Sequence, residues 1–312
     1  MSDAPRPRLS CECLHACSGC EVALLNSGEL FLGLLERVDI VHFPLLMDHK
    51  YQGGAEQGLD LPQAEIGLVS GGVASAEHLR VLRAMRGQCR TLVAFGTCAT
   101  HGGIPALRNQ WTVDQAFRTI LSIDTDERSG EFSSSFASPL DRVYSIDEQV
   151  EVDLVLPGCP PLPETIVEAI GVLAAGERPQ TTEKSVCEHC GALRSGTHHL
   201  MSRRFLANVA TDPGEPIGSM RCLLEQGLLC MGPVTAGGCG GGATPLCIQA
   251  RVPCRGCYGP VRASGNQLLD MLNILASKGI DHRAIVDRRS LLRFSGAHGL
   301  LKPPTRRDGP LR

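Results

Sequence analysis

Residues 237–242 read Gly237-Gly238-Cys239-Gly240-Gly241-Gly242, and they lie inside a stretch from Cys187 to Cys257 that holds eight of the fifteen cysteines of the chain. This stretch has no apolar repeat that would predict a regular helix or strand. Thiolates placed among glycines are typical of a metal centre that the chain wraps from several sides. Glycine also lets backbone N–H groups approach the sulfurs. We therefore expect the local fold to be set by its ligands.

Three chemistries compete for these eight cysteines. Disulfide bonds are disfavoured because fifteen is an odd number and the N-terminal residues lack the apolar core of a secretory signal. A structural zinc site would pair Cys187-x-x-Cys190 with Cys254-x-x-Cys257, but the gap between the pairs is unusually long and four further cysteines would be left over. Iron–sulfur clusters would use all eight, so they are the interpretation we favour.

Composition limits the remaining function classes. The chain has 312 residues, of which 43% are apolar, so it can bury one full domain and a smaller one. Its net charge is -3. We expect acidic and basic residues to be mixed along the chain, which gives no electrostatic footprint for nucleic acid or an anionic membrane. No apolar stretch is long enough to cross a bilayer, and abundant thiols favour a reducing compartment. We expect a cytoplasmic protein with no membrane anchor.

The N-terminal half alternates continuous apolar runs with amphipathic segments. This is the pattern of a parallel sheet covered by helices on both faces. The apolar repeats predict helices over residues 21–37, 74–86 and 162–175. Residues 9–14 are rich in cysteine but stand where a first strand would. The other predicted strands are Val38–Phe43, Ile66–Val69, Thr91–Phe95 and Asp153–Leu156.

Four more cysteines follow predicted strands. Cys17 and Cys20 come after the first strand, Cys98 follows the strand that ends at Phe95, and Cys159 follows the strand 153–156. In open parallel sheets, ligands bind just beyond the carboxyl ends of the strands. We therefore expect these four thiols to meet at one edge of the sheet and to form a third site. The alternative is that Cys98 and Cys159 are buried small hydrophobes, which is the commoner role of a lone cysteine.

Several residues stay outside these groups. Cys11, Cys13 and Cys89 are surplus, and we expect structural or free thiols there, although Cys13 could replace Cys17 if the first strand were placed differently. His189 lies between the first two cysteines of the glycine-rich stretch and could compete as a ligand.

Two carboxylates and four segments remain. Glu21 and Glu164 could carry protons or anchor a partner, although such carboxylates usually face water. A helix is predicted over residues 112–121, and the serine-rich residues 129–138 are expected to form a mobile loop. The tail 301–312 is expected to fray. A later helix presents one apolar face, formed by Leu268, Leu269, Leu272 and Leu275.

Three motifs together resemble one family: Cys17-Ser-Gly-Cys20-Glu21, Gly96-Thr-Cys98-Ala-Thr-His-Gly-Gly103 and Gly158-Cys159-Pro160-Pro161. They are similar to the small, electron-transfer subunit of nickel–iron hydrogenases. The segments Cys222-Leu-Leu-Glu-Gln-Gly-Leu-Leu-Cys230 and Pro253-Cys254-Arg-Gly-Cys257 resemble the two-cluster domain of the cytoplasmic branch. That branch includes the viologen-reducing enzyme that works with heterodisulfide reductase.

The resemblance implies a fold class and three cofactors. The fold would be α/β, with a flavodoxin-like, doubly wound parallel sheet over residues 1–180 and a small cysteine-rich iron–sulfur domain over residues 181–312. A proximal 4Fe-4S cluster, facing the nickel–iron centre of the large subunit, would be bound by Cys17, Cys20, Cys98 and Cys159. A medial 4Fe-4S cluster would be bound by Cys239, Cys247, Cys254 and Cys257. A distal 4Fe-4S cluster would be bound by Cys187, Cys190, Cys222 and Cys230.

Two departures from the family's uptake members matter. In those members the distal site begins with His, whereas this chain offers Cys187. They usually hold a three-iron medial cluster with three cysteines, whereas Cys247 supplies a fourth here. Both differences favour clusters of four irons with only cysteine ligands, which tends to lower their reduction potentials.

By this resemblance the chain conducts electrons from dihydrogen oxidation on the large subunit to an acceptor subunit of flavoprotein, ferredoxin-like or heterodisulfide reductase type. It supplies no catalytic residue of its own, because the cofactors carry the redox chemistry. Two partner surfaces follow, an apolar one beside the proximal cluster and a smaller one near the distal cluster.

Three other functions stay open. One is a free-standing carrier of ferredoxin type, and another is a zinc scaffold. A third is a quinone-reducing subunit like that of respiratory complex I, which shares the ancestry of the first domain. That family carries two adjacent cysteines at its first motif, whereas Ala16 precedes Cys17 here, and it lacks the second cysteine-rich domain.

Overall fold

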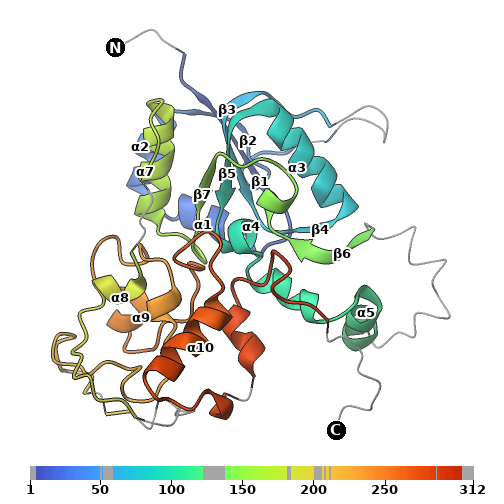
Figure 1. The fold of residues 1–312 in the computed structure, drawn as a ribbon. Coiled ribbons are helices and arrows are strands. Elements are labelled where there is room, and N and C mark those ends of the chain that lie inside the picture. The colour runs from blue at the N-terminus through green and yellow to red at the C-terminus, as the bar shows by residue number, and fades with distance from the viewer. Residues whose placement is uncertain are drawn as a thin grey trace.

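A computed structural model of the chain describes residues 5–49, 51, 59–121, 138–180, 184–199, 206, 209–210, 212–285 and 287–303. Its largest element is a five-stranded parallel sheet with the strand order β2-β1-β3-β5-β7 (Figure 1). In chain order these strands are β1 (Arg8–Cys13), β2 (Asp39–His42), β3 (Ala64–Ser70), β5 (Cys89–Phe95) and β7 (Leu154–Leu156).

The strand order explains how the chain builds the sheet. From β1 the chain adds β2 on one side and then β3, β5 and β7 on the other, which is the flavodoxin-like order with its switch point between β1 and β3. β3 and β5 are nearly continuous apolar runs because both of their faces are covered. The predicted α/β fold class is confirmed, and all five predicted strands are present within one or two residues at each end.

Helices cover both faces of the sheet. On one face α1 (Gly19–Leu25), α2 (Glu29–Leu35) and α7 (Pro163–Ala174) lie together, and on the other lies α3 (Ala76–Gln88) (Figure 1). The first group buries apolar side chains of all three helices against β1, β3 and β5. α3 buries Val81, Leu82 and Met85 against the opposite face. The sheet is therefore doubly wound, as predicted.

Two predicted helices differ in their bounds. The helix expected over residues 21–37 is two helices, because the chain turns at Gly28, whose φ of +60° favours glycine. The helix expected from residue 74 begins at Ala76. The two residues before it belong to a short strand, β4 (Val73–Ser75), and the Ser75 side chain caps the helix by accepting from the His78 N–H.

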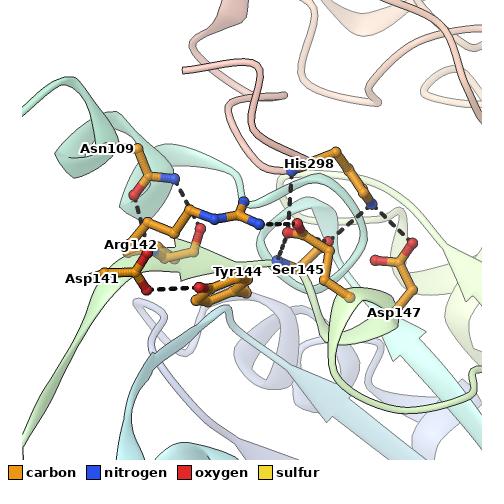
Figure 2. A network of polar contacts seen from close by, with 9 residues as sticks. Asn109, Asp141, Arg142, Tyr144, Ser145, Asp147 and His298 are labelled. Atoms are coloured by element: carbon orange, nitrogen blue, oxygen red, sulfur yellow. Dashed lines mark hydrogen bonds and ion pairs between the residues drawn. The ribbon is translucent and has the colours of Figure 1, made fainter. Parts of the chain in front are cut away.

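The segment between the predicted strands 91–95 and 153–156 contains a strand that we did not predict. β6 (Pro139–Tyr144) pairs antiparallel with β4, and the Asn109 side chain fastens it by accepting from the Val143 N–H at 2.7 Å and donating to the Val143 carbonyl at 2.9 Å (Figure 2). The predicted helix is present as α5 (Val113–Leu121). Of the predicted serine-rich loop, residues 129–137 lie outside the described residues. The nearby short elements are α4 (Thr97–His101) and the 3₁₀ helices η1 (Ile104–Gln110) and η2 (Ile146–Glu148).

The C-terminal half has little regular structure. Among its described residues the one long helix is α10 (Gln267–Ser277), which buries Met271 and Leu275. Of the predicted apolar face, Leu268 and Leu272 are half-buried, but Leu269 is 56% exposed, because it lies about 100° around the helix from Leu268. The other described elements are α8 (Val186–His189), α9 (Leu246–Gln249), η4 (Gly232–Val234), η5 (His282–Ala284) and η6 (Arg288–Leu292). Two apolar clusters lie wholly within residues 186–291, and the two sheet clusters lie wholly within residues 9–174. The domain boundary near residue 180 stays a prediction. Residues 304–312 of the tail are outside the described part.

The last described segment returns to the sheet half at His298 (Figure 2). The His298 Nε2 lies 2.9 Å from Asp147 Oδ2 and 3.1 Å from Ser145 Oγ. The His298 backbone N–H donates to Glu148 Oε2 at 3.1 Å, and the neighbouring N–H of Ala297 donates to the His101 carbonyl at 3.2 Å. These contacts join the two halves through polar groups.

Candidate iron–sulfur sites

Four predicted ligands lie at the carboxyl edge of the sheet, and we call them the proximal set: Cys17, Cys20, Cys98 and Cys159. The sheet register explains why they meet. β1 and β3 are paired up to Cys13 and Ser70, and β5 and β7 are paired up to Phe95 and Leu156. Because the parallel strands end level, the segments that follow them begin side by side.

The thiols of the proximal set act on one another electrostatically. Burial, and then the charges of Cys159 and Cys17, raise the pKa of Cys98 to about 12. Burial and the adjacent carboxylate of Glu21 raise the pKa of Cys20, and the three other thiols of the set raise it further. Thiolates this close together ionise only when a cation offsets their repulsion. The set therefore has the chemistry of a metal site.

Glycine and threonine shape the backbone around the proximal set. Gly96 has a φ of +82°, and a Cβ placed on it would lie 2.3 Å from the Cys20 sulfur, so only glycine fits. Next to it, Thr97 Oγ1 accepts from the Gly158 N–H at 2.9 Å and donates to the Cys257 carbonyl. Thr97 thus fastens the exits of two strands to the C-terminal half.

Four cysteines of the glycine-rich stretch surround a cavity between the halves, and we call them the medial set: Cys239, Cys247, Cys254 and Cys257. The cavity has a volume of about 480 Å³ and is also lined by Cys159, Pro161 and Tyr258. Burial, and then the charges of Cys247 and Cys239, raise the pKa of Cys257 to about 12.

The remaining predicted ligands form the distal set: Cys187, Cys190, Cys222 and Cys230. The short helix α8 carries Cys187, and Cys190 follows its last residue. A capping box at Ser185 fixes the start of the helix. Burial, and then the charge of Cys230, raise the pKa of Cys187 to about 12. The guanidinium of Arg194, which donates to the Cys187 carbonyl, acts in the opposite direction.

The three sets lie in a row. Cys159 of the proximal set lines the same cavity as the four medial cysteines, so the proximal and medial sets are neighbours. The Cys254 N–H donates to the Cys230 sulfur at 3.3 Å, so the medial and distal sets touch. The medial set therefore stands between the other two.

Comparisons with known proteins identify the family of the chain. The chain is 34% identical to a vhu subunit of the F420-non-reducing hydrogenase of Methanocaldococcus jannaschii, over 89% of this chain and 91% of that protein. The chain belongs to the family of nickel–iron hydrogenase small subunits. It is also 33% identical to an iron-sulfur subunit of the F420-non-reducing hydrogenase of Archaeoglobus profundus, over 86% of this chain and 88% of that one. This hydrogenase small subunit is thus an iron–sulfur subunit of the F420-non-reducing branch.

Two further comparisons concern the fold. Residues 17–173 match the family described as NADH ubiquinone oxidoreductase, 20 Kd subunit, which agrees with the ancestry shared with complex I that the motifs imply. A [NiFeSe]-hydrogenase from Desulfomicrobium baculatum superposes with a TM-score of 0.51, covering 82% of this chain and 95% of that one at 17% identity. That likeness shows the fold alone. Among the described residues, no helix of this small subunit is long and apolar enough to cross a membrane.

The thiol sets fit iron–sulfur clusters better than the two alternatives. All fifteen cysteines lie in the described part, and all are free of disulfide bonds. Within that part, no three His, Cys, Asp or Glu side chains converge tightly enough to bind a single metal ion, as zinc would require. A cluster has several irons, so its thiolates stand farther apart. The buried Tyr258 hydroxyl lines the medial cavity and has no hydrogen-bond partner among the described residues, which suits a donor to a cluster held there.

The surplus cysteines lie in different environments. Cys11 and Cys89 are buried core residues of β1 and β5. The Cys13 sulfur lies 3.5 Å from the Ser18 hydroxyl. The charge of Cys17 contributes to the raised pKa of Cys20, Cys98 and Cys159, whereas Cys13 is among the contributors for Cys98 alone of these three, and this difference favours Cys17 as the ligand.

The two carboxylates have different environments. Glu164 is exposed at the start of α7, as predicted. Glu21 is 1% exposed, so the prediction that it faces water is wrong for this residue. Burial raises the pKa of Glu21, because α1 turns the carboxylate into the protein. His189 lies at the end of α8, and whether it is a ligand stays a prediction.

Sequence reasoning missed two residues of these sites. Thr97 lies inside the Gly96-Thr97-Cys98 motif, and a polar residue between a glycine and a ligand could have indicated its bridging role. Tyr258 follows Cys257 directly, so its place beside a ligand was visible in the sequence. Nothing in the sequence indicated that its hydroxyl would be buried without a partner.

Proposed function

We propose that this hydrogenase small subunit relays electrons through three 4Fe-4S clusters, held by the proximal, medial and distal sets. The electrons would come from dihydrogen oxidation on the large subunit and would pass to an acceptor subunit. Because its relatives are named F420-non-reducing hydrogenases, we propose an acceptor other than F420 for this complex.

The observation that carries this proposal is the row formed by the three sets. The medial set adjoins the proximal set at Cys159 and Cys257, and it adjoins the distal set at Cys230 and Cys254. A free-standing carrier needs no such row, since one exposed cluster can both receive and deliver an electron. Three sets in line are useful when one partner delivers electrons to one end and another partner accepts them from the other end.

The residues of the chain would do three things for this relay. Their thiolates would ligate the irons, and each cluster, when bound, would supply one-electron redox chemistry. Apolar groups around the medial cavity, such as Pro161 and Leu246, would exclude water and keep the local dielectric low. Thr97 would hold the halves together so that the distance between the proximal and medial sets stays fixed.

The ends of the row suggest where the partners sit. Cys17 and Cys159 of the proximal set are exposed, which suits a large subunit that covers them. Trp111 and Ile104, each 44% exposed, lie on the segment that follows Cys98 and offer apolar surface for that subunit.

Anaerobic purification with the large subunit tests this proposal. We expect about twelve irons per small subunit, four for each of three clusters. Cys98→Ser should remove one cluster and stop dihydrogen-dependent reduction of viologen, because the proximal set is the entry point. Cys187→Ser should remove a different cluster and mainly slow the acceptor. Cys89→Ser is the matched control, since this core thiol should leave the iron content unchanged.

Three results would contradict the proposal. The first is about four irons per chain, or zinc in place of iron. The second is equal loss of all clusters in both ligand variants, which would overturn the assignment of ligands to sets. The third is purification without any nickel-containing partner, which would favour a free-standing carrier.

A further inference from the structure

The two halves of the chain carry opposite charges. Residues 1–180 contain 13 Lys and Arg against 24 Asp and Glu, whereas residues 181–312 contain 17 against 9. Their net charges are therefore -11 and +8, which add up to the -3 of the whole chain. The expectation that charges are mixed along the chain is wrong, because the total conceals this division.

Part of the positive charge lies on one segment of the C-terminal half. Arg288 and Arg289 of η6 are exposed, as is Arg255, and Arg293 just after η6 is half-buried. None of the four forms an ion pair with a carboxylate of the described residues. Arginines without an internal partner are available to carboxylates of another molecule.

Two of these arginines stand at a groove. The groove has a volume of about 240 Å³ and reaches the thiol residue Cys254. Arg255, Ser290 and Arg293 supply its polar lining. The apolar lining includes Leu206, Leu228, Leu229, Met231, Val252 and Leu291. Apolar surface with cationic groups beside it is the arrangement of a specific protein interface, where apolar burial gives affinity and charge gives orientation.

The groove lies where two thiol sets meet. Cys254 belongs to the medial set, and its backbone N–H donates to the sulfur of Cys230 in the distal set. A protein seated here would be close to ligands of both. On the proposed function electrons leave from the distal set, whose ligand Cys230 lies beside this groove.

We propose that this arginine-bearing groove is the docking surface for an acidic electron-carrier protein, one whose own docking face combines apolar side chains with carboxylates. The proposal rests on the proposed function, because it assigns a partner to the delivering end of the relay. Guanidinium groups bind carboxylates through paired hydrogen bonds, and opposite charges speed the encounter of the two proteins. Oxidation of one dihydrogen gives two electrons and two protons, so two molecules of a one-electron carrier are reduced per turnover.

Two other occupants fit less well. The described lining residues include no aromatic side chain on which a nucleic-acid base could stack. A second copy of this chain could offer its acidic half, but such a head-to-tail contact would continue into a filament unless its rotation closed a ring.

The test uses the anaerobically purified hydrogenase complex and an acidic plant-type [2Fe-2S] ferredoxin as the probe. Binding is measured by isothermal titration without dihydrogen, and ferredoxin reduction by stopped-flow spectroscopy with it. Reversing both groove charges, Arg255→Glu with Arg293→Glu, should weaken binding and slow association by about tenfold or more at low salt. Raising the salt from about 20 to 200 mM should abolish most of that difference. The single variant Arg293→Glu leaves the loop between Cys254 and Cys257 unchanged. It should weaken ferredoxin binding in the same direction, but by less.

The matched control is Arg80→Glu with Arg83→Glu on α3, two exposed arginines of the sheet half. This pair changes the total charge equally and should leave ferredoxin binding unchanged. The proposal is overturned by equal losses in both pairs, by unchanged binding in the groove variants, or by a short DNA that binds as tightly as ferredoxin. It is also overturned if the complex self-associates and loses this property in the groove variants. Failure of the relay itself would appear separately, as ferredoxin binding without dihydrogen-dependent reduction.

Discussion

Residues 8–174 hold their shape with a five-stranded sheet between two layers of helices, whereas the described part of residues 184–303 has one α-helix longer than four residues. Eight of the twelve proposed ligands lie in this second half. In the first half the apolar period of the sequence determines the fold, and its ligands stand at strand ends that exist without them. In the second half the ligands lie in the irregular segments themselves.

The thiols show what the second half lacks without metal. Burial and neighbouring thiols raise the pKa of Cys187 and of Cys257 to about 12, and burial raises that of Cys230 to about 11. Near neutral pH these groups would be protonated, and they ligate metal only as thiolates. Metal binding must therefore displace protons, and it couples the structure of this half to iron. The comparison predicts that the two halves respond differently to the loss of iron.

Removal of iron should give the largest effect. Anaerobic chelation is expected to raise amide hydrogen exchange by orders of magnitude across residues 220–260, because local opening there is no longer opposed by the clusters. The strands β3 and β5 should keep their protection, since their hydrogen bonds and apolar contacts involve no ligand. Mass spectrometry of peptides from both halves measures this.

The control for that experiment is reloading with ferrous iron and sulfide under reducing conditions, which should restore protection in residues 220–260. Retained protection in the second half after complete loss of iron would contradict the dependence of that half on iron. So would simultaneous loss in both halves, because it would show that they fold as one unit.

A smaller effect is expected from the core of the sheet half. Leu68 of β3 is 1% exposed, so Leu68→Ala should lower the free energy of unfolding of the sheet half by about 2–5 kcal/mol. The loss should be equal in iron-loaded and iron-free protein, because Leu68 contacts only the sheet core. Denaturation followed by tryptophan fluorescence measures it, since Trp111 lies in this half. Leu269→Ala is the control, because Leu269 is 56% exposed on α10. A loss at Leu68 that depends on iron would contradict the independence of the two halves.

The same contrast explains what the sequence could predict. Continuous apolar runs such as 91–95 marked the strands, because a strand buried on both faces leaves that signature. Gly28 was visible within the predicted helix 21–37, but the apolar repeat continued across it and concealed the break. β6 was missed because its exposed and buried residues alternate only weakly and its pairing with β4 spans a long stretch of chain.

The site followed a similar rule. The positions of Cys98 and Cys159 could be predicted because the parallel strands before them end at one edge of the sheet. Residues far apart in the sequence become neighbours at that edge. The burial of Glu21 could not be predicted, since it depends on how α1 packs against the sheet. The opposite net charges of the two halves could have been counted from the sequence, but the net charge of the whole chain does not reveal them.

The joint between the halves should respond to pH, with the smallest effect of the three. The hydrogen bond with Asp147 raises the pKa of His298, while burial opposes it. Burial would raise the pKa of Asp147, but the hydrogen bonds and charges around it, foremost those of His298, together outweigh burial and hold the pKa below its ordinary value. His101 nearby stays neutral because burial lowers its pKa to about 4. His298 and Asp147 are therefore the pair that titrates.

The sign of the effect follows from these two shifts. The contribution of His298 is complete below its ordinary pKa of about 6.5 and is lost as the pH rises through the raised value. The contribution of Asp147 is complete above its ordinary pKa of about 3.9 and is lost as the pH falls through the lowered value. The joint should be strongest between about pH 4 and 6.5 and weaker at pH 8. Because the side chains are 38% and 44% exposed, the change should be about 1 kcal/mol or less.

Hydrogen exchange in residues 295–301 at pH 6 and pH 8, corrected with an unstructured peptide of the same sequence, measures this change. Asp147→Asn should remove the pH dependence. Asp141→Asn is the matched control, because the Asp141 carboxylate accepts from the Tyr144 hydroxyl and does not contact His298 (Figure 2). If exchange in residues 295–301 slowed toward pH 8, or if both variants behaved alike, the pair would not be the joint. The halves would then be held together by other contacts, such as the hydrogen bonds from Thr97 Oγ1 to the Cys257 carbonyl and from the Ala297 N–H to the His101 carbonyl.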